Sequence, residues 1–592
     1  MHGQQRQILE NKHKPSIELS ENSIRVLKSR YLRRSAAGAL TESPSGMFER
    51  VAIAISRAEL TWGNARDAEN WQRIFYDMMH GLRFLPNSPT LMNAGTPANQ
   101  LSACFVLPVE DHLEDIFSTL KLSALIQQRG GGTGFNFSHL RPRNDMLLTT
   151  QGTSSGPVAF MRIFDAATEH IRQGGKRRGA NMGILNIDHP DIEAFIRCKH
   201  DEGAIRNFNI SVGVSDAFMQ SLTRDDFWPL IHPNTRMEVR RIRARDLWDQ
   251  IVYHAWLTGD PGLIFLDTIN ASNPTPALGE IEATNPCGEV PLMPFESCNL
   301  GSINLSRFLK DVTIDWTALE KTIVVAIRFL DDVIEVNKYL SSEIREMVEG
   351  NRKIGLGIMG WAEALSRLGI PYESKSAVDL AAKLMKFVAD KSRDASMALA
   401  RERGTFGNWK KSVYYPDTPI RNATRTSIAP TGTISIIADT SSSIEPFFAL
   451  AYQRKHVLED DTLTEINQSL LDYLAGNSKA SEILEAIRLT GTLEGTNALP
   501  EQAKRIFKTA LEILPEWHLK HQAAFQTYTD NAVSKTINLP QNSTPADVSS
   551  IYQSAWKAKL KGITVFRNNA RTKQVMQQGI TSDIKGCKIC IA

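Results

Sequence analysis

The pentapeptide Asn-Pro-Cys-Gly-Glu at residues 285–289 carries an amide, a thiol and a carboxylate at alternate positions. In an extended segment, Asn285, Cys287 and Glu289 would point to the same side and into one pocket. The three groups offer a hydrogen-bond donor, a reactive sulfur and a general base. A buried cysteine beside a turn fits the pentapeptide equally well, but Cys298 follows eleven residues later and favours redox chemistry.

The cysteines are the most informative residues of the chain. They are Cys104, Cys198, Cys287, Cys298, Cys587 and Cys590. The N-terminus, Met1–Arg6, is polar and has no apolar core, so it is not a secretory signal. We therefore expect a cytoplasmic protein whose clustered cysteines are catalytic, redox-active or metal-bound rather than a disulfide framework.

The last two cysteines, Cys587 and Cys590, lie in a polar, glutamine-containing tail. A zinc knuckle is one interpretation, but zinc usually takes four ligands. No histidine follows His521 and no other cysteine follows Cys298, so we expect no metal site. Two thiols separated by two residues can instead form a small disulfide and exchange it by thiolate attack.

Two glycine-containing segments suit close approach to a ligand. Gln128–Asn136 carries four glycines, which let the backbone come near a ligand; a flexible loop is the alternative. It lacks the strand–GxGxxG–helix order of a dinucleotide fold. Ala429–Ser435 suits the opening of a helix, where backbone N–H groups cradle a phosphate, although an ordinary turn fits it too. It has no Walker lysine, so nucleotide hydrolysis is not implied.

Two other segments carry weaker signals. Asn87–Gly95, which leads into Ser102–Phe105, reads alone as a polar turn followed by a buried cysteine. Gln173–Met182 is a basic, glycine-flanked loop that suits anionic ligands. As a bare charge run, it would more often be solvated surface.

The elements that must position these groups belong to an ordinary globular chain. Apolar residues make up 42% and charged residues 22% of the 592 residues, which excludes disorder and a coiled-coil rod. The net charge of +3 is too balanced for a nucleic-acid-binding face. No apolar run approaches the ~18 residues that span a bilayer, so we expect neither nucleic-acid nor membrane partners.

Hydrophobic periodicity predicts α/β architecture. The first ~80 residues have helical spacing, with a loop expected at Thr41–Gly46. Phe208–Val214 alternates apolar and polar residues like a strand, and Leu263–Leu266 is a short apolar run typical of a buried strand. Apolar residues over 323–334 form a helical stripe. Strands that alternate with helices indicate an α/β fold, which we interpret as a barrel.

Together these segments resemble the catalytic chain of ribonucleotide reductases, and most closely the adenosylcobalamin-dependent class. The most specific part is Asn-Pro-Cys-Gly-Glu followed by Ser-Cys-Asn-Leu-Gly-Ser-Ile-Asn-Leu, at 285–289 and 297–305. The other matching motifs are, in order, Asn-Ser-Pro-Thr-Leu (87–91), Ser-Ala-Cys-Phe (102–105), Gly-Thr-Gly-Phe-Asn (132–136), Lys-Arg-Arg-Gly-Ala (176–180) and Pro-Thr-Gly-Thr-Ile-Ser (430–435).

The resemblance implies a fold and its division into domains. The expected fold is a ten-stranded α/β barrel of two half-barrels, with Cys287 on a central finger loop. We expect an N-terminal helical domain at residues 1–84, the barrel at 85–570 and a flexible redox-active tail at 571–592.

The resemblance also implies the reaction: ribonucleotides, as diphosphates, are reduced to 2′-deoxyribonucleotides for DNA synthesis, with adenosylcobalamin as cofactor. By the same resemblance, Cys287 becomes a thiyl radical that abstracts the 3′-hydrogen, Glu289 takes the 3′-OH proton and Asn285 binds the sugar hydroxyls. Cys104 and Cys298 end as a disulfide, with Cys104 as proton donor to the departing 2′-oxygen. Cys198 matches none of these roles and is expected to be a structural thiol.

Binding residues follow from the same motifs. The expected substrate contacts are Ser88, Ala103, Cys104, Gly132, Asn285, Pro286, Cys287, Gly288, Glu289, Pro430, Thr431, Gly432, Thr433 and Ile434. The expected contacts of a dNTP or ATP effector are Asp111, Arg141, Lys176 and Arg177. Cys587 and Cys590 would relay electrons from a thioredoxin- or glutaredoxin-like protein, and the specificity site would lie at the interface of a homodimer.

Two alternatives remain at this stage. One is the partner-dependent class, whose radical arrives from a metal-containing subunit, but the adjacent tyrosines of its relay are missing near the C-terminus, since Tyr414-Tyr415 lies too early. The other is a non-enzymatic nucleotide-binding regulator. It predicts missing catalytic side chains, whereas all five are present: Cys104, Asn285, Cys287, Glu289 and Cys298.

Overall fold

Helices form the N-terminal part of the computed structural model, which describes residues 17–147, 151–173, 177–201, 203–458, 461–570 and 576–580. They are α1 (Glu21–Val26), the π-helix η1 (Leu27–Tyr31), α2 (Pro44–Ser56), the 3₁₀-helix η2 (Arg57–Thr61) and α3 (Ala65–His80). The loop expected at Thr41–Gly46 ends earlier than predicted. Ser43 caps α2 by accepting a hydrogen bond from Gly46 N, and Pro44 occupies the first turn, so the helix begins there.

Five parallel strands form the first half of the barrel. In spatial order they are β2 (Cys104–Val106), β3 (Gly132–Asn136), β6 (Asn181–Asn186), β7 (Phe208–Val214) and β10 (Gly262–Phe265). The intervening helices are α5 (Leu113–Gln128), α6 (Pro157–His170), α7 (Ile192–Arg197), α8 (Asp216–Arg224) and α9 (Ala244–Thr258). Strand β7 has the bounds predicted from its alternation, and β10 lies one residue earlier than its predicted run.

The second half repeats this arrangement. Its strands are β13 (Ser297–Asn304), β16 (Ile354–Met359), β19 (Thr536–Leu539) and β20 (Gly562–Arg567). Bridges from Leu356 to Thr426 and from Ile428 to Val533 place segment 426–428 between β16 and the approach to β19. The main helices of this half are α11 (Trp316–Val336), α12 (Ser342–Asn351), α13 (Trp361–Arg367), α14 (Lys375–Arg403), α19 (Pro515–Gln526) and α20 (Pro545–Lys557).

The two halves meet where neighbouring strands run antiparallel, at β10–β20 and at β2–β13. These two junctions, together with the bridges through 426–428, close the ring. The ten-stranded sheet also includes β1 (Phe84–Pro86), which pairs with the C-terminal part of β13. The predicted ten-stranded α/β barrel of two half-barrels, preceded by helices, is therefore confirmed.

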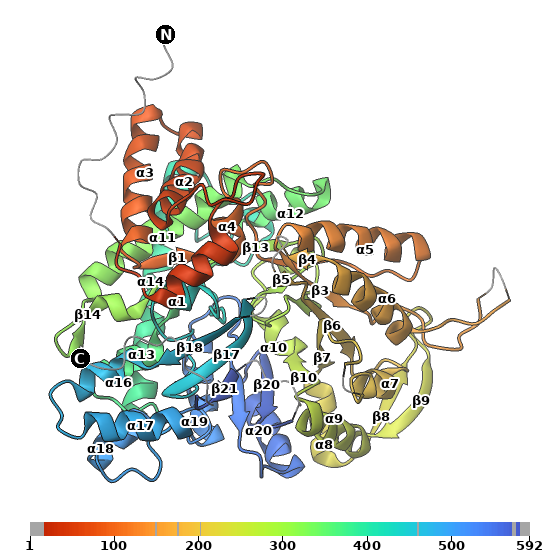
Figure 1. Cartoon of the computed structure of the whole chain (residues 1–592). Helices are drawn as coiled ribbons and strands as arrows, with labels where there is room; N and C mark the ends of the chain where they lie inside the picture. Colours follow the sequence, from red (N-terminus) through yellow and green to blue (C-terminus); the bar gives the residue numbers. More distant parts are fainter. Residues whose placement is uncertain are drawn as a thin grey trace.

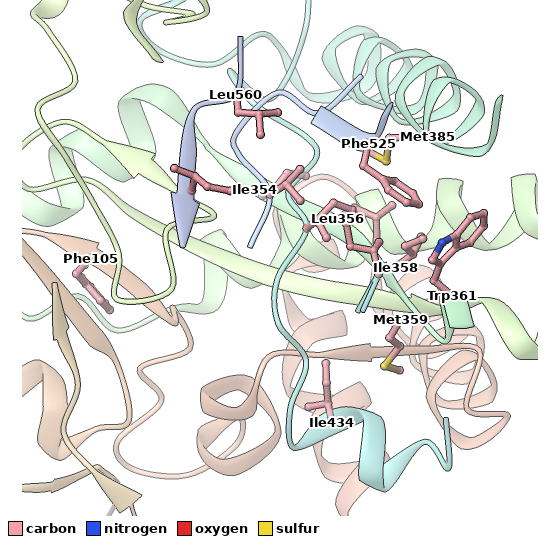
Figure 2. Packing of buried hydrophobic residues seen from close by; sticks show 14 of the residues in the cluster. Phe105, Ile354, Leu356, Ile358, Met359, Trp361, Met385, Ile434, Phe525 and Leu560 are labelled. Carbon is pink, nitrogen blue, oxygen red and sulfur yellow. The ribbon is translucent and has the colours of Figure 1, made fainter. Parts of the chain in front are cut away.

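The wall of the barrel is packed tightly against its helices. All six residues of β16 are buried, as expected for a parallel strand covered on both faces. Figure 2 shows Ile354, Leu356 and Ile358 beside Phe525 of α19 and Met385 of α14. The Trp361 ring packs edge-on against Phe525 at 5.3 Å between centroids. This packing holds the strand ends that carry the site.

Buried charges join the N-terminal helices to the barrel helices, and Figure 1 shows α2 and α3 beside α11. Glu59 of η2 pairs with Arg328 of α11 at 2.6 Å and with Arg403 of α14 at 2.8 Å. Arg403 also pairs with Asp332 at 2.6 Å. Asp331 pairs with three arginines. The ion cluster, as we call it, consists of Glu59, Arg328, Asp331, Asp332, Arg352, Arg403 and Arg421.

The remaining elements surround the barrel ends. They are α4 (Ser88–Asn93), β4 (Arg172–Gln173), β5 (Arg177–Arg178), β8 (Phe227–Ile231), β9 (Glu238–Arg243), α10 (Leu266–Ala271), η3 (Pro276–Leu278), β11 (Ala283–Thr284), β12 (Pro291–Leu292), η4 (Leu305–Phe308), β14 (Leu309–Lys310), β15 (Thr313–Ile314), η5 (Trp409–Lys411), α15 (Ile434–Ile437), β17 (Ala451–Leu458), β18 (Asp461–Ile466), α16 (Gln468–Leu474), α17 (Ala480–Thr490), α18 (Glu501–Ile506) and β21 (Met576–Gln578). Strand β21 pairs with β17 and so joins part of segment 571–592 to the body. Across the described ranges, no helix is both long and apolar enough to cross a bilayer.

Candidate active site

Residues 285–290 form a tight loop between the paired strands β11 and β12. Asn285 N donates to Val290 O at 3.4 Å, and Gly288 N donates to Asn285 O at 3.0 Å. Gly288 has φ +80°, a conformation that glycine adopts without strain. The expectation of an extended segment is therefore wrong. The turn buries Asn285 and Glu289, while Cys287 is exposed at the tip.

The loop is held from both halves of the barrel. Asn209 of β7 donates its side-chain N–H to Pro286 O at 2.8 Å. From the other half, Ala532 N and Ser427 Oγ both donate to Glu289 O at 2.9 Å. Sequence reasoning did not identify Asn209 and Ser427 as loop anchors. The signal for Asn209 was its polar position in the alternation of Phe208–Val214.

The glycines of β3 make room for this loop. A Cβ at Gly134 would lie 1.9 Å from Thr284 O, and one at Gly132 would lie 2.9 Å from Pro286 Cγ. Both glycines belong to a fully buried strand. The flexible-loop alternative for this part of Gln128–Asn136 is therefore wrong, and the close approach that the glycines permit is that of the finger loop itself.

Glu289 and Asn285 form the polar centre of the site. Asn285 Nδ2 donates to Glu289 Oε2 at 2.8 Å and lies 3.2 Å from Cys104 Sγ. Burial raises the pKa of Glu289 to about 7, against the opposing hydrogen bond from Asn285. A carboxyl with that pKa exchanges protons readily near neutral pH. The amide thus links a potential general base to a buried thiol.

Cys104 and Cys298 lie directly opposite each other in the antiparallel pairing of β2 with β13. Opposite residues have Cα atoms about 4.5–5.5 Å apart, which falls in the roughly 4.4–6.8 Å range of disulfides. Both are free, buried thiols, and burial raises the pKa of each well above its usual value. The backbone can therefore accommodate either two thiols or a disulfide. Cys198 lies apart, at the C-terminal end of α7.

The predicted substrate residues Ala103 and Gly132 adjoin these thiols. Ala103 N donates to Cys298 O at 3.1 Å, and Gly132 N donates to Ala103 O at 2.8 Å. Ser88 is the first residue of α4, and its Oγ lies 2.7 Å from the hydroxyl of Tyr31 in the N-terminal helices. Residue 87, just before it, donates its N–H to Leu300 O of β13.

The segment Pro430–Ile434 opens a helix, as predicted, because α15 begins at Ile434. Thr431 has φ +51°, and its Oγ1 accepts a hydrogen bond from Ser443 N at 2.7 Å. Gly432 is exposed, and no atom lies within 4 Å of a Cβ built there. The first N–H groups of a helix have no acceptor within it, so this turn can offer them to an anion.

The remaining predicted residues are described in part. Arg141 Nε lies 2.6 Å from Asp111 Oδ2, which also accepts from Asn234 at 2.7 Å. Arg177 lies in β5, which forms a hairpin with β4. Lys176, Cys587 and Cys590 lie outside the described residues.

Fold and site together define an α/β-barrel oxidoreductase that carries an exposed thiol on an internal loop, close to a buried pair of thiols. Residues 102–566 match the family described as "Ribonucleotide reductase, barrel domain", and residues 17–99 match "Ribonucleotide reductase, all-alpha domain". The chain belongs to the ribonucleotide reductase family.

Similar proteins extend over nearly the whole chain. A protein of Thermoplasma acidophilum named vitamin B12-dependent ribonucleoside-diphosphate reductase is 46% identical over 96% of this chain and 81% of its own length. One with the same name from Mycobacterium tuberculosis H37Rv is 48% identical over 95% and 79%. The solved alpha subunit of the Actinobacillus ureae class Id ribonucleotide reductase superposes with a TM-score of 0.76 at 25% identity, covering 94% of this chain and 99% of that subunit.

Proposed function

We propose that this chain reduces ribonucleoside diphosphates to 2′-deoxyribonucleoside diphosphates by thiyl-radical chemistry, with adenosylcobalamin as the radical source. The single observation that carries the proposal is the placement of Cys287 at the loop tip, with the Cys104–Cys298 pair and Glu289 buried behind it. The relatives that are 46–48% identical bear the corresponding name, which favours this reading over the partner-dependent alternative.

The side chains of the site then divide the steps of the reaction among them. The Cys287 thiyl radical takes the 3′-hydrogen atom, and the Glu289 carboxylate takes the 3′-OH proton while Asn285 orients the sugar hydroxyls. Cys104 gives its proton to the 2′-oxygen, which leaves as water. Cys104 and Cys298 together supply two electrons and become a disulfide, and their second hydrogen ends on C2′. Glu289 returns its proton to the 3′-oxygen, and the 3′-hydrogen atom returns from Cys287. Burial keeps both thiols protonated until they react, because it raises their pKa values.

The residues around Cys287 fit a large cofactor. The thiol is exposed, and no atom lies within 4 Å of a Cβ built on Gly288, so one side of the tip is open. Cys287 and Gly288 would form the protein face that meets adenosylcobalamin. When bound, that cofactor supplies a radical by homolysis of its cobalt–carbon bond.

Substrate phosphates would occupy the turn Pro430–Ile434, and the ribose would lie against Ala103, Gly132 and the finger loop. The exposed Gly432 supports the phosphate placement, because its open position lets an anion reach the backbone N–H groups at the start of α15. Ser88 of α4 would also contact the substrate. Its Oγ is held by the hydroxyl of Tyr31, which belongs to the N-terminal helices.

The test is deoxynucleotide formation by the purified chain with a small dithiol, with and without adenosylcobalamin. We expect product only when the cofactor is present. Equal product without it, or a requirement for a separate metal-containing subunit, would overturn the proposal. Di- and triphosphate substrates compared in the same assay test the diphosphate assignment.

Regulation and reduction complete the proposal. A dNTP or ATP effector would bind near Asp111, Arg141, Lys176 and Arg177 at a homodimer interface and change substrate preference through the loop 173–182. Coupling of about 1–3 kcal/mol is typical of allosteric sites, so preferences should shift severalfold; unchanged preferences with deoxynucleotide effectors would contradict this.

Electrons would reach the Cys104–Cys298 disulfide through Cys587 and Cys590 from a thioredoxin- or glutaredoxin-like protein of the reducing cytoplasm. A Cys587→Ser, Cys590→Ser variant should lose turnover with such a protein and keep it with a small dithiol. Full activity with the protein reductant would eliminate the relay, and equal loss with both reductants would indicate a structural role.

A further inference from the structure

A buried lysine, Lys353, lies immediately before β16, the strand that pairs with β13 on the side opposite β2. Strand β16 runs parallel to β13 with Ile354 opposite Asn299, and Cys104 lies opposite Cys298 on the other side. Lys353 directly precedes Ile354, as Cys298 directly precedes Asn299, so each of the two residues lies one position before the first paired residues of the two strands. The side chain of Leu300 covers Gly355, two residues further along both strands, on the face that points into the barrel.

Glu296 anchors this lysine. Lys353 Nζ lies 2.6 Å from Glu296 Oε2, and both side chains are almost fully buried. Glu296 also accepts from Asn351 Nδ2 at 2.6 Å and from Met293 N at 2.8 Å. An ammonium has three donors, and within the described residues Lys353 Nζ has Glu296 as its one hydrogen-bond partner.

The two thiols of the pair therefore differ in the charges around them. Burial raises the pKa of Cys298, the Lys353 ammonium opposes that rise, and Glu296 and Glu289 add to it. For the Cys104 thiol, burial, Glu289, Cys298 and Cys287 raise the pKa, and the group that opposes them among the described residues is the neutral amide of Asn285, not a cation. A thiol leaves a disulfide faster when its thiolate is better stabilised.

We propose that Lys353, anchored by Glu296, is a positioning residue that stabilises negative charge on the Cys298 sulfur while the Cys104–Cys298 disulfide is reopened. The thiolate of an external dithiol forms a bond to Cys104 Sγ as the bond to Cys298 breaks, and Cys298 leaves as a thiolate. The second thiol of the reductant then closes its own disulfide and releases Cys104. The two electrons and two protons of the dithiol end on the two cysteines.

This inference rests on the proposed function for the presence of the disulfide, but its test needs neither nucleotide nor cofactor. In a chain with Cys287, Cys587 and Cys590 replaced by serine, diamide oxidises the pair. Dithiothreitol then reopens it, and N-ethylmaleimide traps the freed thiols for peptide mass spectrometry. Failure to make deoxynucleotides would overturn the proposed function and leave this measurement intact.

The charge-free variant Lys353→Met, Glu296→Gln should reopen about tenfold more slowly, because Cys298 becomes a poorer leaving group. The matched control is Lys199→Met, Asp260→Asn, which removes another buried pair, 2.9 Å apart, beside the unrelated Cys198. The control should reopen at the parent rate. A parent rate in the first variant, or equal slowing in both, would overturn the proposal.

A second variant separates charge from packing. Lys353→Ala leaves a space beside Glu296, so ethylammonium ions should restore the reopening rate, whereas ethanol of similar size should not. Near-UV circular dichroism of this variant, compared with that of the parent, tests whether it is folded. Absence of rescue in the folded variant would overturn the proposal even if the double variant fails to fold.

Discussion

Two buried polar groups, the site around Glu289 and the ion cluster around Asp331, respond to burial in opposite ways. Both residues are buried, with 3% of Glu289 and 0% of Asp331 exposed. Burial raises the pKa of Glu289 to about 7, because the hydrogen bonds that oppose it, from the amide of Asn285 and from backbone, come from neutral groups. Burial works in the same direction on Asp331, but Arg352, Arg421 and Arg403 outweigh it and hold that pKa below its usual range.

For these two carboxyls, the supply of cationic partners rather than burial decides whether the pKa is raised or lowered. Asp331 is held as an anion by guanidinium groups and is unavailable for proton exchange. Near neutral pH, Glu289 is close to equal populations of its protonated and ionised forms. It lies beside thiols whose pKa values are also raised. Perturbation of this kind is typical of catalytic sites.

The sharpest expected effect is at the loop tip. Cys287→Ser should abolish deoxynucleotide formation while nucleotide binding survives, because an O–H bond is too strong for easy hydrogen-atom exchange. Product assays paired with equilibrium dialysis of the nucleotide measure both quantities. Turnover clearly above background would show that another residue carries the radical.

Glu289→Gln should lower turnover by about 10²–10⁴-fold, the usual contribution of a general base. In the parent enzyme, turnover should rise with pH through about 7, since only the carboxylate accepts a proton. The variant should lose that rise. A variant that retained the parent rate and pH profile would remove Glu289 from the mechanism.

Asp331→Asn should act on stability instead. It leaves Arg352, Arg403 and Arg421 without their shared anion, and breaking a buried ion pair on one side costs about 3–5 kcal/mol. We expect a lower urea midpoint, with turnover per folded molecule unchanged. Loss of turnover without loss of stability would erase the distinction between the two groups.

The smallest expected effect is on the free energy of unfolding, where Glu289→Gln should stabilise the protein although it lowers turnover. The folded-state pKa of Glu289 is raised, so the folded state disfavours the charged form that the unfolded chain adopts above its ordinary pKa of 4.5. Stability is therefore lost as the pH rises from about 4.5 to about 7. Glu289→Gln should be more stable than the parent by about 1–3 kcal/mol at pH 8, and nearly equal to it at pH 4. A destabilised variant at pH 8 would contradict this.

Much of the fold was predictable because the local sequence patterns of these elements agree with the tertiary packing around them. The alternation of Phe208–Val214 specified β7 at both ends, and the apolar stripe over 323–334 lies within α11. The finger loop was misjudged because spacing of two was taken as extended backbone. Pro286 and Gly288 turn the chain there, and the turn, not strand alternation, brings Asn285 to Glu289.

The reactive residues were predictable by family resemblance, but their electrostatic surroundings were not. Lys353 and Glu296 are separated by 57 positions, and although Glu296 directly precedes the motif at 297–305, no pattern in the sequence pairs it with Lys353. Their proximity depends on the register of β16 against β13, which is set by packing across the sheet. Likewise, Glu59 meets Arg403 across 344 positions, a distance over which local pattern carries no information.

The antiparallel pairing of β2 with β13 has a mechanical consequence. It is one of the two places where the half-barrels adjoin, and the opposed thiols sit on either side of it. A bond between them would join the two halves through residues that are 194 positions apart in the sequence (298 − 104), and crosslinks that close long loops restrict the unfolded chain most. The oxidised enzyme, which contains the Cys104–Cys298 disulfide, is then also the form that unfolds least easily. The oxidised enzyme would therefore be more resistant to unfolding, not less, in the interval before a reductant restores its thiols.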